Sequence, residues 1–152
     1  MGKPVTPLKF SMQLPCTSEF VGVARLALSG IATRMNFTVE EIEDIKISVS
    51  EACTNCVQYA YEDGSLNLIE IDTYLHPTFL EIIVRDSGRG FDVAHALSQP
   101  AREAPVPGKM GLGLGLTFMR NLMDVSEVMS EPGRGTTVRL VKNVPTPTHA
   151  SA

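Results

Sequence analysis

The sequence predicts an α+β fold, a two-layer α/β sandwich in which helices cover one face of a mixed, mostly antiparallel sheet. Two observations lead to this prediction. Short runs of alternating apolar residues are typical of half-buried strands, whereas longer segments with an apolar residue at every third or fourth position are typical of helices. Their order is strand, helix, helix, strand, strand, loop, helix, strand, strand. Strands and helices do not alternate singly, which disfavours a doubly wound parallel sheet.

The N-terminal part of the chain is expected to form one strand and two helices. Residues 8–14 alternate apolar and polar side chains and predict a half-buried strand, and residues 17–35 have apolar side chains at helical spacing. A second helix is expected to begin at Thr38, because Thr38 and Glu41 can form a capping box that satisfies two backbone N–H groups. Its apolar stripe continues to about Ala60.

The C-terminal part of the chain is expected to supply the remaining strands and a third helix. Residues 69–75 and 79–84 alternate apolar residues on either side of a His-Pro break, which predicts a hairpin. Residues 114–124 predict a helix. Residues 125–130 are expected to pair with residues 136–144 across a turn that contains proline and glycine.

Length and composition indicate one domain. A chain of 152 residues with 43% hydrophobic residues can bury one core, so residues 1–144 are expected to form a single domain. Within it, residues from about 93 to 110 are proline-rich and show little periodicity. This segment is predicted to be a mobile lid, because compact domains rarely keep long irregular loops without a function. Residues 145–152 are expected to be a disordered tail.

The charge and the N-terminus disfavour several classes of function. A net charge of −4 and a pI near 5.3 provide no basic surface for nucleic acid or for an anionic membrane. The N-terminus lacks the apolar segment of a signal peptide, and no apolar run reaches the ~18 residues that a membrane-spanning helix needs. We therefore expect a cytoplasmic protein that contacts neither nucleic acid nor a membrane directly.

The cysteines include a C-x-x-C motif at Cys53 and Cys56. A redox pair of this kind needs a helix N-terminus to lower the thiol pKa, whereas this pair lies well inside the second expected helix. A zinc site would need a second pair of ligands, and Cys16 and the histidines offer none at a recognisable spacing. The pair is therefore interpreted as small buried side chains, and Cys16 is the thiol expected to react.

Two polar side chains of the second helix form the first candidate site. Glu51 and Asn55 are four residues apart and share, with Asp44 and Ser48, the face opposite the apolar stripe. A solvated polar face is the ordinary explanation of such a pattern. Chemistry offers an alternative, because the Asn55 carbonyl oxygen suits Mg²⁺ and Glu51 could take a proton from a nucleophile that attacks a phosphoryl group.

Two glycine-rich motifs form the second candidate site. RDSGRGFD follows a predicted strand, and its glycines permit either a sharp turn or a close approach of the backbone to another group. KMGLGLGLTF has a glycine at every second position just before a helix, where successive backbone N–H groups can bind an anion. The residues concerned are Asp86, Gly88 and Gly90 in the first motif, and Gly111, Gly113 and Gly115 in the second.

In the order E-x-x-x-N, D-x-G-x-G, lid, G-x-G-x-G and G-T-T, these motifs resemble the Bergerat ATP-binding fold. Gyrase-type ATPases, Hsp90 chaperones, histidine kinases and small serine kinases share this fold. The resemblance implies that Asn55 binds Mg²⁺, that Glu51 is the general base and that Asp86 accepts a hydrogen bond from the adenine amino group of ATP. It implies further nucleotide contacts by Gly88, Gly90, Lys109, Gly111, Gly113, Gly115, Thr136 and Thr137. A histidine kinase is disfavoured, because no upstream phosphoacceptor histidine precedes His76.

The block from Glu19 to Tyr61 is similar to the anti-sigma factors with serine kinase activity, above all the RsbW family of the general-stress pathway. The resemblance covers about residues 8–142. It implies a homodimer with two exclusive partners: a stress-type sigma factor, held while ATP is bound, and an anti-sigma factor antagonist that is phosphorylated on serine or threonine. Arg25 matches the partner surface of the family. Lys109 stands where relatives can carry an arginine that reaches the γ-phosphate, and Arg102 is the other candidate for this role.

Two other functions stay open at this point. One is a nucleotide-gated module that sequesters a sigma factor without phosphorylating anything, and the other is a switch kinase that acts on a stressosome scaffold. The presence of Glu51 favours an enzyme, because a pure binding module has no evident need of a base. The block from Glu19 to Tyr61 favours the anti-sigma group over the switch kinase.

Overall fold

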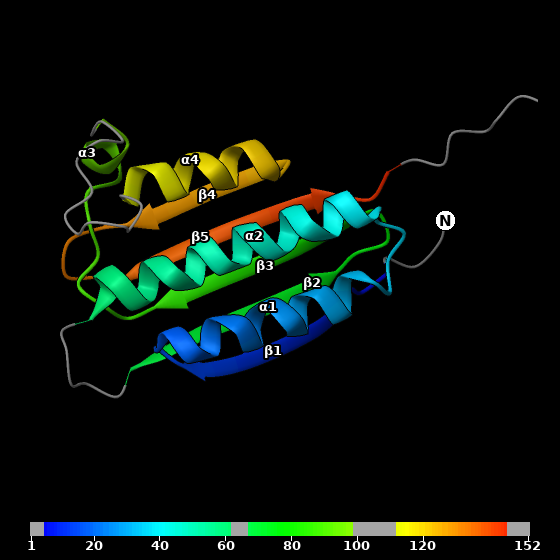
Figure 1. Cartoon of the computed structure of the whole chain (residues 1–152), viewed down its shortest axis with the longest axis horizontal. Coiled ribbons are helices and arrows are strands. Elements are labelled where there is room, and N and C mark those ends of the chain that lie inside the picture. Colours follow the sequence, from blue (N-terminus) through cyan, green and yellow to red (C-terminus); the bar gives the residue numbers. More distant parts are fainter. Residues whose placement is uncertain (1–4, 62–66, 99–111, 146–152) are drawn as a thin grey trace, which may run out of the picture.

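The fold consists of a five-stranded sheet with helices over one of its faces (Figure 1). The computed structural model describes residues 5–61, 67–98 and 112–145. The strands lie in the order β1-β2-β3-β5-β4, and each neighbouring pair is antiparallel. The predicted α+β class and two-layer arrangement are therefore confirmed, and the sheet is antiparallel throughout its described strands.

The helices and strands follow the expected order, with α3 added. The strands are β1 (Leu8–Pro15), β2 (Leu68–Leu75), β3 (Phe79–Asp86), β4 (Val125–Ser130) and β5 (Thr136–Asn143). The helices are α1 (Ser18–Ala32), α2 (Val39–Asn55), the π-helix η1 (Cys56–Ala60), α3 (Val93–Ser98) and α4 (Leu112–Leu122). The predicted lid of residues 93–110 thus begins with a short helix instead of an irregular loop. Residues 99–110 of this segment, and 146–152 of the predicted tail, lie outside the described residues.

Helix α2 lies in the middle of the helical layer, between α1 and α4 (Figure 1). It begins with the predicted capping box. The Glu41 N–H donates to Thr38 Oγ1 at 3.2 Å, and the Thr38 N–H donates to Glu41 Oε2 at 2.7 Å. These bonds satisfy backbone donors that the helix would otherwise leave open. The local sequence therefore defines where α2 begins.

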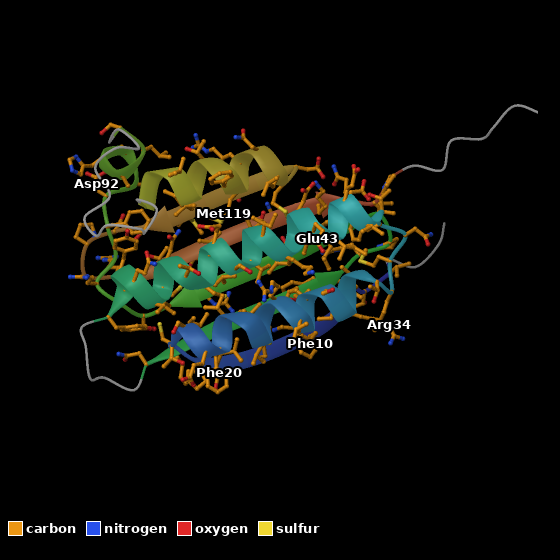
Figure 2. All side chains as sticks on the ribbon, in the orientation of Figure 1. Phe10, Phe20, Arg34, Glu43, Asp92 and Met119 are labelled. Atoms are coloured by element: carbon orange, nitrogen blue, oxygen red, sulfur yellow. The ribbon has the colours of Figure 1, made fainter. Side chains whose placement is uncertain are left out.

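The core lies between the helices and the covered face of the sheet. Alternate side chains of the inner strands β2 and β3 point into it and are almost fully buried: Ile69, Ile71, Leu80, Ile82 and Val84. The helices meet them with Leu28 of α1, Ile45 and Val49 of α2, and Met119 of α4, which is labelled in Figure 2. Burial of apolar surface, at roughly 25 cal/mol per Å², holds the two layers together.

Strand β1 is less buried than its alternating pattern predicts. Leu14 is buried, whereas Leu8 and Phe10 are 73% and 40% exposed. The reason is the place of β1 at the edge of the sheet, where β2 is its only partner among the described strands. The N-terminal half of β1 thus leaves apolar side chains on the surface next to α1.

Candidate active site

A pocket lies between the C-terminal end of α2, η1, α4 and the ends of β3 and β5. These ends of α2 and β3 lie on the same side of the molecule as α3 (Figure 1). Its lining is mostly apolar and includes a few polar groups. The lining residues are Ala52, Asn55, Cys56, Tyr59, Ala60, Val84, Asp86, Gly90, Phe91, Leu116, Thr136 and Val138. An apolar hollow with a few convergent polar groups is the usual form of a small-molecule site.

Asp86 is the last residue of β3 and lines this pocket. Its Oδ1 accepts a hydrogen bond from the Gly88 N–H at 2.9 Å, and its Oδ2 accepts one from the Cys56 thiol, with 3.3 Å between Sγ and Oδ2. An ionised carboxylate has about four lone-pair positions, so two of them stay open for a ligand. Asp86 therefore offers an acceptor to an amino group that enters between the apolar walls.

Glu51 and Asn55 lie together on the part of α2 that approaches α4. A Cβ atom built on Gly115 of α4 would lie 3.0 Å from Glu51 Oε2 and 3.5 Å from both Asn55 Oδ1 and Asn55 Nδ2. The missing side chain of Gly115 lets α4 come this close to two polar groups. Burial raises the pKa of Glu51 above its ordinary value. A carboxylate with a raised pKa is a better proton acceptor, as a general base requires.

This face of α2 is not a solvated polar surface, which was the ordinary explanation of its pattern. Ser48 is fully buried, and its hydroxyl has no hydrogen-bond partner among the described residues. Asp44 forms an ion pair with Lys142 of β5 at 3.2 Å. Covering polar side chains costs free energy unless they are well paired. Glu51 and Asn55 are half-buried on the same face, next to Gly115 of α4, which favours a functional reason for these two side chains.

Gly88 and Gly90 bring the loop after β3 against two other backbone segments. A Cβ atom on Gly88 would overlap the carbonyl oxygen of Ala60, and one on Gly90, where φ is +64°, would overlap that of Glu131. Gly90 lines the pocket, whereas Gly88 contributes its N–H to Asp86. The close approach that the glycines permit is therefore to the chain's own backbone in both cases.

Gly88→Ala is expected to destabilise the protein by about 1–3 kcal/mol, because the new methyl group must displace backbone at Ala60 and not a flexible side chain. Urea unfolding measures the change. Gly30→Ala in α1 is the matched control: nothing lies within 4 Å of its Cβ position, and alanine is the better helix former by about 1 kcal/mol. Equal stability of Gly88→Ala and the parent would contradict the close contact.

Two glycines of the second motif, Gly113 and Gly115, lie within α4 and not just before it. Helix α4 begins at Leu112, earlier than the predicted start at residue 114, so that Gly113 and Gly115 are helical. A Cβ atom on Gly113 would overlap the Ala96 carbonyl oxygen, so this glycine permits α3 to pack closely on α4. Three residues with predicted phosphate contacts lie outside the described residues: Arg102, Lys109 and Gly111.

Thr136 and Thr137 are neighbours on β5 whose side chains point to opposite faces of the sheet. Thr136 lines the pocket, and its Oγ1 lies 2.7 Å from Ser130 Oγ. Thr137 borders a different hollow, together with Met129 of β4. The structure therefore brings Thr136 to the candidate site and leaves Thr137 outside it. Arg25 also lies outside the pocket, on the exposed side of α1.

All three cysteines are free thiols, and Cys53 and Cys56 are buried. Burial raises the pKa of Cys53 to about 12, and burial together with the Asp86 charge raises the pKa of Cys56 further. Burial and the same charge also raise the pKa of Cys16 to about 11. Because the thiolate is the reactive form, the structure removes the reason to expect fast reaction of Cys16.

Every cysteine is therefore expected to react slowly with a thiol reagent at neutral pH while the protein is folded. A labelling time course measures the rates, and the same protein unfolded in urea is the control in which all of the thiols should react quickly. Rapid labelling of Cys53 or Cys56 in the folded state, with loss of activity, would instead support the redox pair that their C-x-x-C spacing suggested.

Sequence reasoning missed the π-helix η1, which supplies Cys56, Tyr59 and Ala60 to the pocket. Arg89 holds this turn in place: its Nε donates to the Tyr59 carbonyl oxygen at 2.6 Å, and its N–H donates to the Ala60 carbonyl oxygen at 2.8 Å. π-helical turns are frequent at functional sites. The residues of η1 continue the helical apolar pattern of α2, so the sequence gives no sign of the wider turn.

The donor chemistry around Asn55 fits a magnesium ion that is bound together with a nucleotide. Within the part of the chain that the structure describes, no group of three or more His, Cys, Asp or Glu side chains could hold a metal ion. Mg²⁺ usually keeps several waters and takes one or two protein ligands along with phosphate oxygens. The Asn55 amide oxygen and the Glu51 carboxylate, which lie side by side next to Gly115, satisfy this requirement.

Comparison with known proteins gives consistent matches over most of the chain. Residues 14–142 match the family of histidine kinase-like ATPase domains. The chain is 41% identical over 130 residues to the serine-protein kinase RsbW of Halalkalibacterium halodurans, and 42% identical over 134 residues to that of Bacillus subtilis. These alignments cover 84% and 86% of this chain, and 79% and 82% of the two relatives.

Among solved structures, the fold is similar to the RsbU and RsbW domains of a Mycobacterium tuberculosis protein, with a TM-score of 0.67 and 20% sequence identity. This match covers 92% of the chain and 33% of the longer mycobacterial chain. The likeness at this identity concerns the fold alone. None of the helices in the described ranges is long and apolar enough to cross a membrane.

Proposed function

Because this chain belongs to the RsbW family of serine-protein kinases, we propose that it uses ATP to phosphorylate a serine or threonine of an anti-sigma factor antagonist and that it also sequesters a stress-type sigma factor. One observation carries the proposal. Glu51 and Asn55 lie together beneath Gly115, at the rim of the pocket that contains Asp86. A base and a metal ligand thus stand next to a hollow that suits a purine.

The apolar pocket is the proposed adenine site. Val84, Leu116 and Val138 supply apolar walls for the flat ring, and Asp86 accepts a hydrogen bond from the adenine amino group. The phosphates then extend toward the N-terminal end of α4. The backbone N–H groups in the first turn of a helix lack intrahelical partners and attract anions. The nucleotide would therefore extend from β3 to α4, past Asn55.

Glu51 is the proposed general base and Asn55 the proposed ligand of Mg²⁺. The carboxylate of Glu51 takes the proton of the attacking serine or threonine hydroxyl, and its raised pKa makes it a stronger base. When bound, Mg²⁺ would neutralise charge that develops on the transferred phosphoryl group. Since the two side chains are one helical turn apart, the base and the metal ligand can act at the same phosphate group of ATP.

The surface formed by α1 and the N-terminal half of β1 is the proposed partner surface. It exposes large apolar side chains: Leu8, Phe10, Val23 and Leu26, of which Phe10 is labelled in Figure 2. Arg25 is also exposed on α1 and adds a positive charge, and β1 leaves one strand edge unpaired among the described strands. Exposed apolar groups beside an open edge suit protein partners. We assign a second copy of the chain and the sigma factor to this side. We also propose that the protein acts in the cytoplasm.

Asp86→Asn is expected to weaken ATP binding by about 1–3 kcal/mol, because an acceptor-only group becomes one that can present a donor to the adenine amine. Isothermal titration calorimetry measures the change. Asp92→Asn is the matched control, since Asp92 is exposed and its side chain accepts from the His95 N–H at the start of α3, a role that asparagine can keep. Unchanged ATP affinity in Asp86→Asn would remove Asp86 from the adenine site.

One experiment tests the proposed function as a whole. The purified chain is incubated with labelled ATP and candidate antagonists, and then assayed for capture of sigma factors. Label on a serine or threonine of an antagonist, together with sigma capture, supports the proposal. Sigma capture without transfer would instead indicate a binding module, and transfer to a stressosome scaffold without sigma capture would indicate a switch kinase.

A further inference from the structure

We propose that Cys56 is a positioning residue for adenine recognition: its thiol donates a hydrogen bond to Asp86 and holds this carboxylate in the orientation in which it accepts the adenine amino group. The inference rests on the proposed function, which puts adenine against Asp86. It assigns a specific role to one cysteine of a C-x-x-C motif that is neither a redox pair nor a metal site. Cys56 would act through Asp86 and not on the reacting phosphate.

The two oxygens of Asp86 are held by donors from two different directions. Oδ1 accepts from the Gly88 N–H at 2.9 Å, and Oδ2 accepts from Cys56 Sγ at 3.3 Å. The backbone donor belongs to the loop after β3, whereas the thiol comes from the first residue of η1. One donor alone would let the carboxylate rotate about its last side-chain bond. Two donors define the plane of the carboxylate and so the direction of its free lone pairs.

The thiol is placed where a donor is useful and water is scarce. Cys56 is 5% exposed and lines the pocket next to Asp86, among walls that include Val84 and Leu116. Apolar walls on one side leave the half-buried Asp86 carboxylate with fewer solvent donors than it would have on an open surface, so each protein donor has more influence. Arg89 donates hydrogen bonds to the carbonyl oxygens of Tyr59 and Ala60, in the same turn as Cys56.

The protonation state of Cys56 agrees with a donor role. An ordinary thiol is protonated at neutral pH, so its proton is available to Asp86. A thiolate at this position would repel the carboxylate. Since S–H is a weak donor, the expected contribution is moderate and concerns the choice of base more than the total affinity.

A matched set of nucleotides and variants tests the inference. ATP and purine riboside triphosphate, which lacks the amino group, are titrated into the parent, Cys56→Ala, Cys56→Val, Cys56→Ser and Cys53→Ala. Loss of the thiol in Cys56→Ala is expected to weaken ATP binding about three- to fivefold, the lower part of the range of one ordinary hydrogen bond because S–H is a weak donor, and to change purine riboside triphosphate binding less than about twofold. Cys56→Ser should restore the ATP preference, because a hydroxyl can replace the thiol as donor.

The other variants separate hydrogen bonding from packing. Cys56→Val fills the wall of the pocket without a donor and should show the same selective loss as Cys56→Ala, so it replaces that variant if alanine impairs folding. Cys53→Ala removes a buried thiol one turn earlier that does not line the pocket, and both affinities should stay at the parental values. Equal weakening of both nucleotides, or no loss of ATP preference in Cys56→Val, would overturn the inference.

The parent and Asp86→Asn distinguish this failure from failure of the proposed function. If the parent binds ATP and purine riboside triphosphate equally, or if Asp86→Asn keeps the ATP preference, the adenine amine does not meet Asp86, and both the adenine site and the role of Cys56 are wrong. If Asp86→Asn abolishes the preference and neither Cys56→Ala nor Cys56→Val changes it, Asp86 recognises adenine unaided. Only the inference about Cys56 then fails.

Discussion

Replacing Glu51 with alanine is expected to slow phosphotransfer from ATP about 10²–10⁴-fold, the usual contribution of a general base, while ATP binding largely survives. The base acts only as the hydroxyl loses its proton, so its removal raises the barrier without weakening the ground-state complex. Glu51 also stands outside the lining of the pocket, so that adenine binding does not depend on it. Transfer rates at saturating Mg-ATP and calorimetric ATP affinities measure the two effects separately.

Glu43→Ala provides the matched control for Glu51→Ala on the same helix. Glu43 is exposed and forms a surface ion pair with Lys46 at 2.8 Å, an interaction that contributes little to stability. This variant is expected to phosphorylate the antagonist at the parental rate. If Glu51→Ala also keeps the parental rate, the assignment of the base is wrong.

The pH dependence of the rate examines the same residue independently. A general base is active only when ionised, so the rate should fall as the pH drops through the pKa of Glu51. Because burial raises this pKa, the fall is expected at a higher pH than the ordinary value of 4.5 would give. Glu51→Gln should lose this acidic limb together with most of the rate.

Local patterns in the sequence located most of the fold. The capping box of Thr38 and Glu41 and the alternation in β2 and β3 depend on neighbours along the chain, and both appear in the structure. The short helix α3 was missed because six residues are too few to show a periodicity. The exposure of Leu8 and Phe10 was missed because alternation does not tell an edge strand from a central one.

Some features of the candidate site could likewise be predicted from the sequence, and others could not. Glu51 and Asn55 could be paired from the sequence, because four residues make about one turn of a helix. The bond between Cys56 and Asp86 joins residues 30 positions apart. It depends on how η1 lies against the end of β3, which no local pattern reveals. The choice between Thr136 and Thr137, by contrast, could have been made from the sequence, because Val138, Arg139 and Leu140 alternate and Thr136 is in phase with the two apolar residues that meet the helices.

Asn55→Ala is expected to remove both the metal-linked nucleotide state and the transfer reaction. Asn55 lines the pocket beside Glu51 and is the proposed protein ligand of Mg²⁺. Loss of the ion's charge neutralisation is worth several kcal/mol in a phosphoryl-transfer transition state, or roughly 10²–10⁴-fold in rate. The measurements are the transfer rate and the dependence of ATP affinity on Mg²⁺ concentration. Asn121→Ala, at an exposed position of α4, should change neither.

Affinity for the sigma factor is expected to distinguish Glu51→Ala from Asn55→Ala. If sigma binds the ATP-loaded homodimer, Glu51→Ala should still capture it, since that variant keeps Mg-ATP bound, whereas Asn55→Ala should capture it poorly because its nucleotide state is lost. Affinity for sigma at saturating Mg-ATP is measured for both. If both variants transfer phosphate at near-parental rates, Glu51 and Asn55 have no part in the reaction. Equal loss of sigma in both would mean that one conformational state serves phosphorylation and sequestration together, and that Glu51 contributes to that state and not only to the proton transfer.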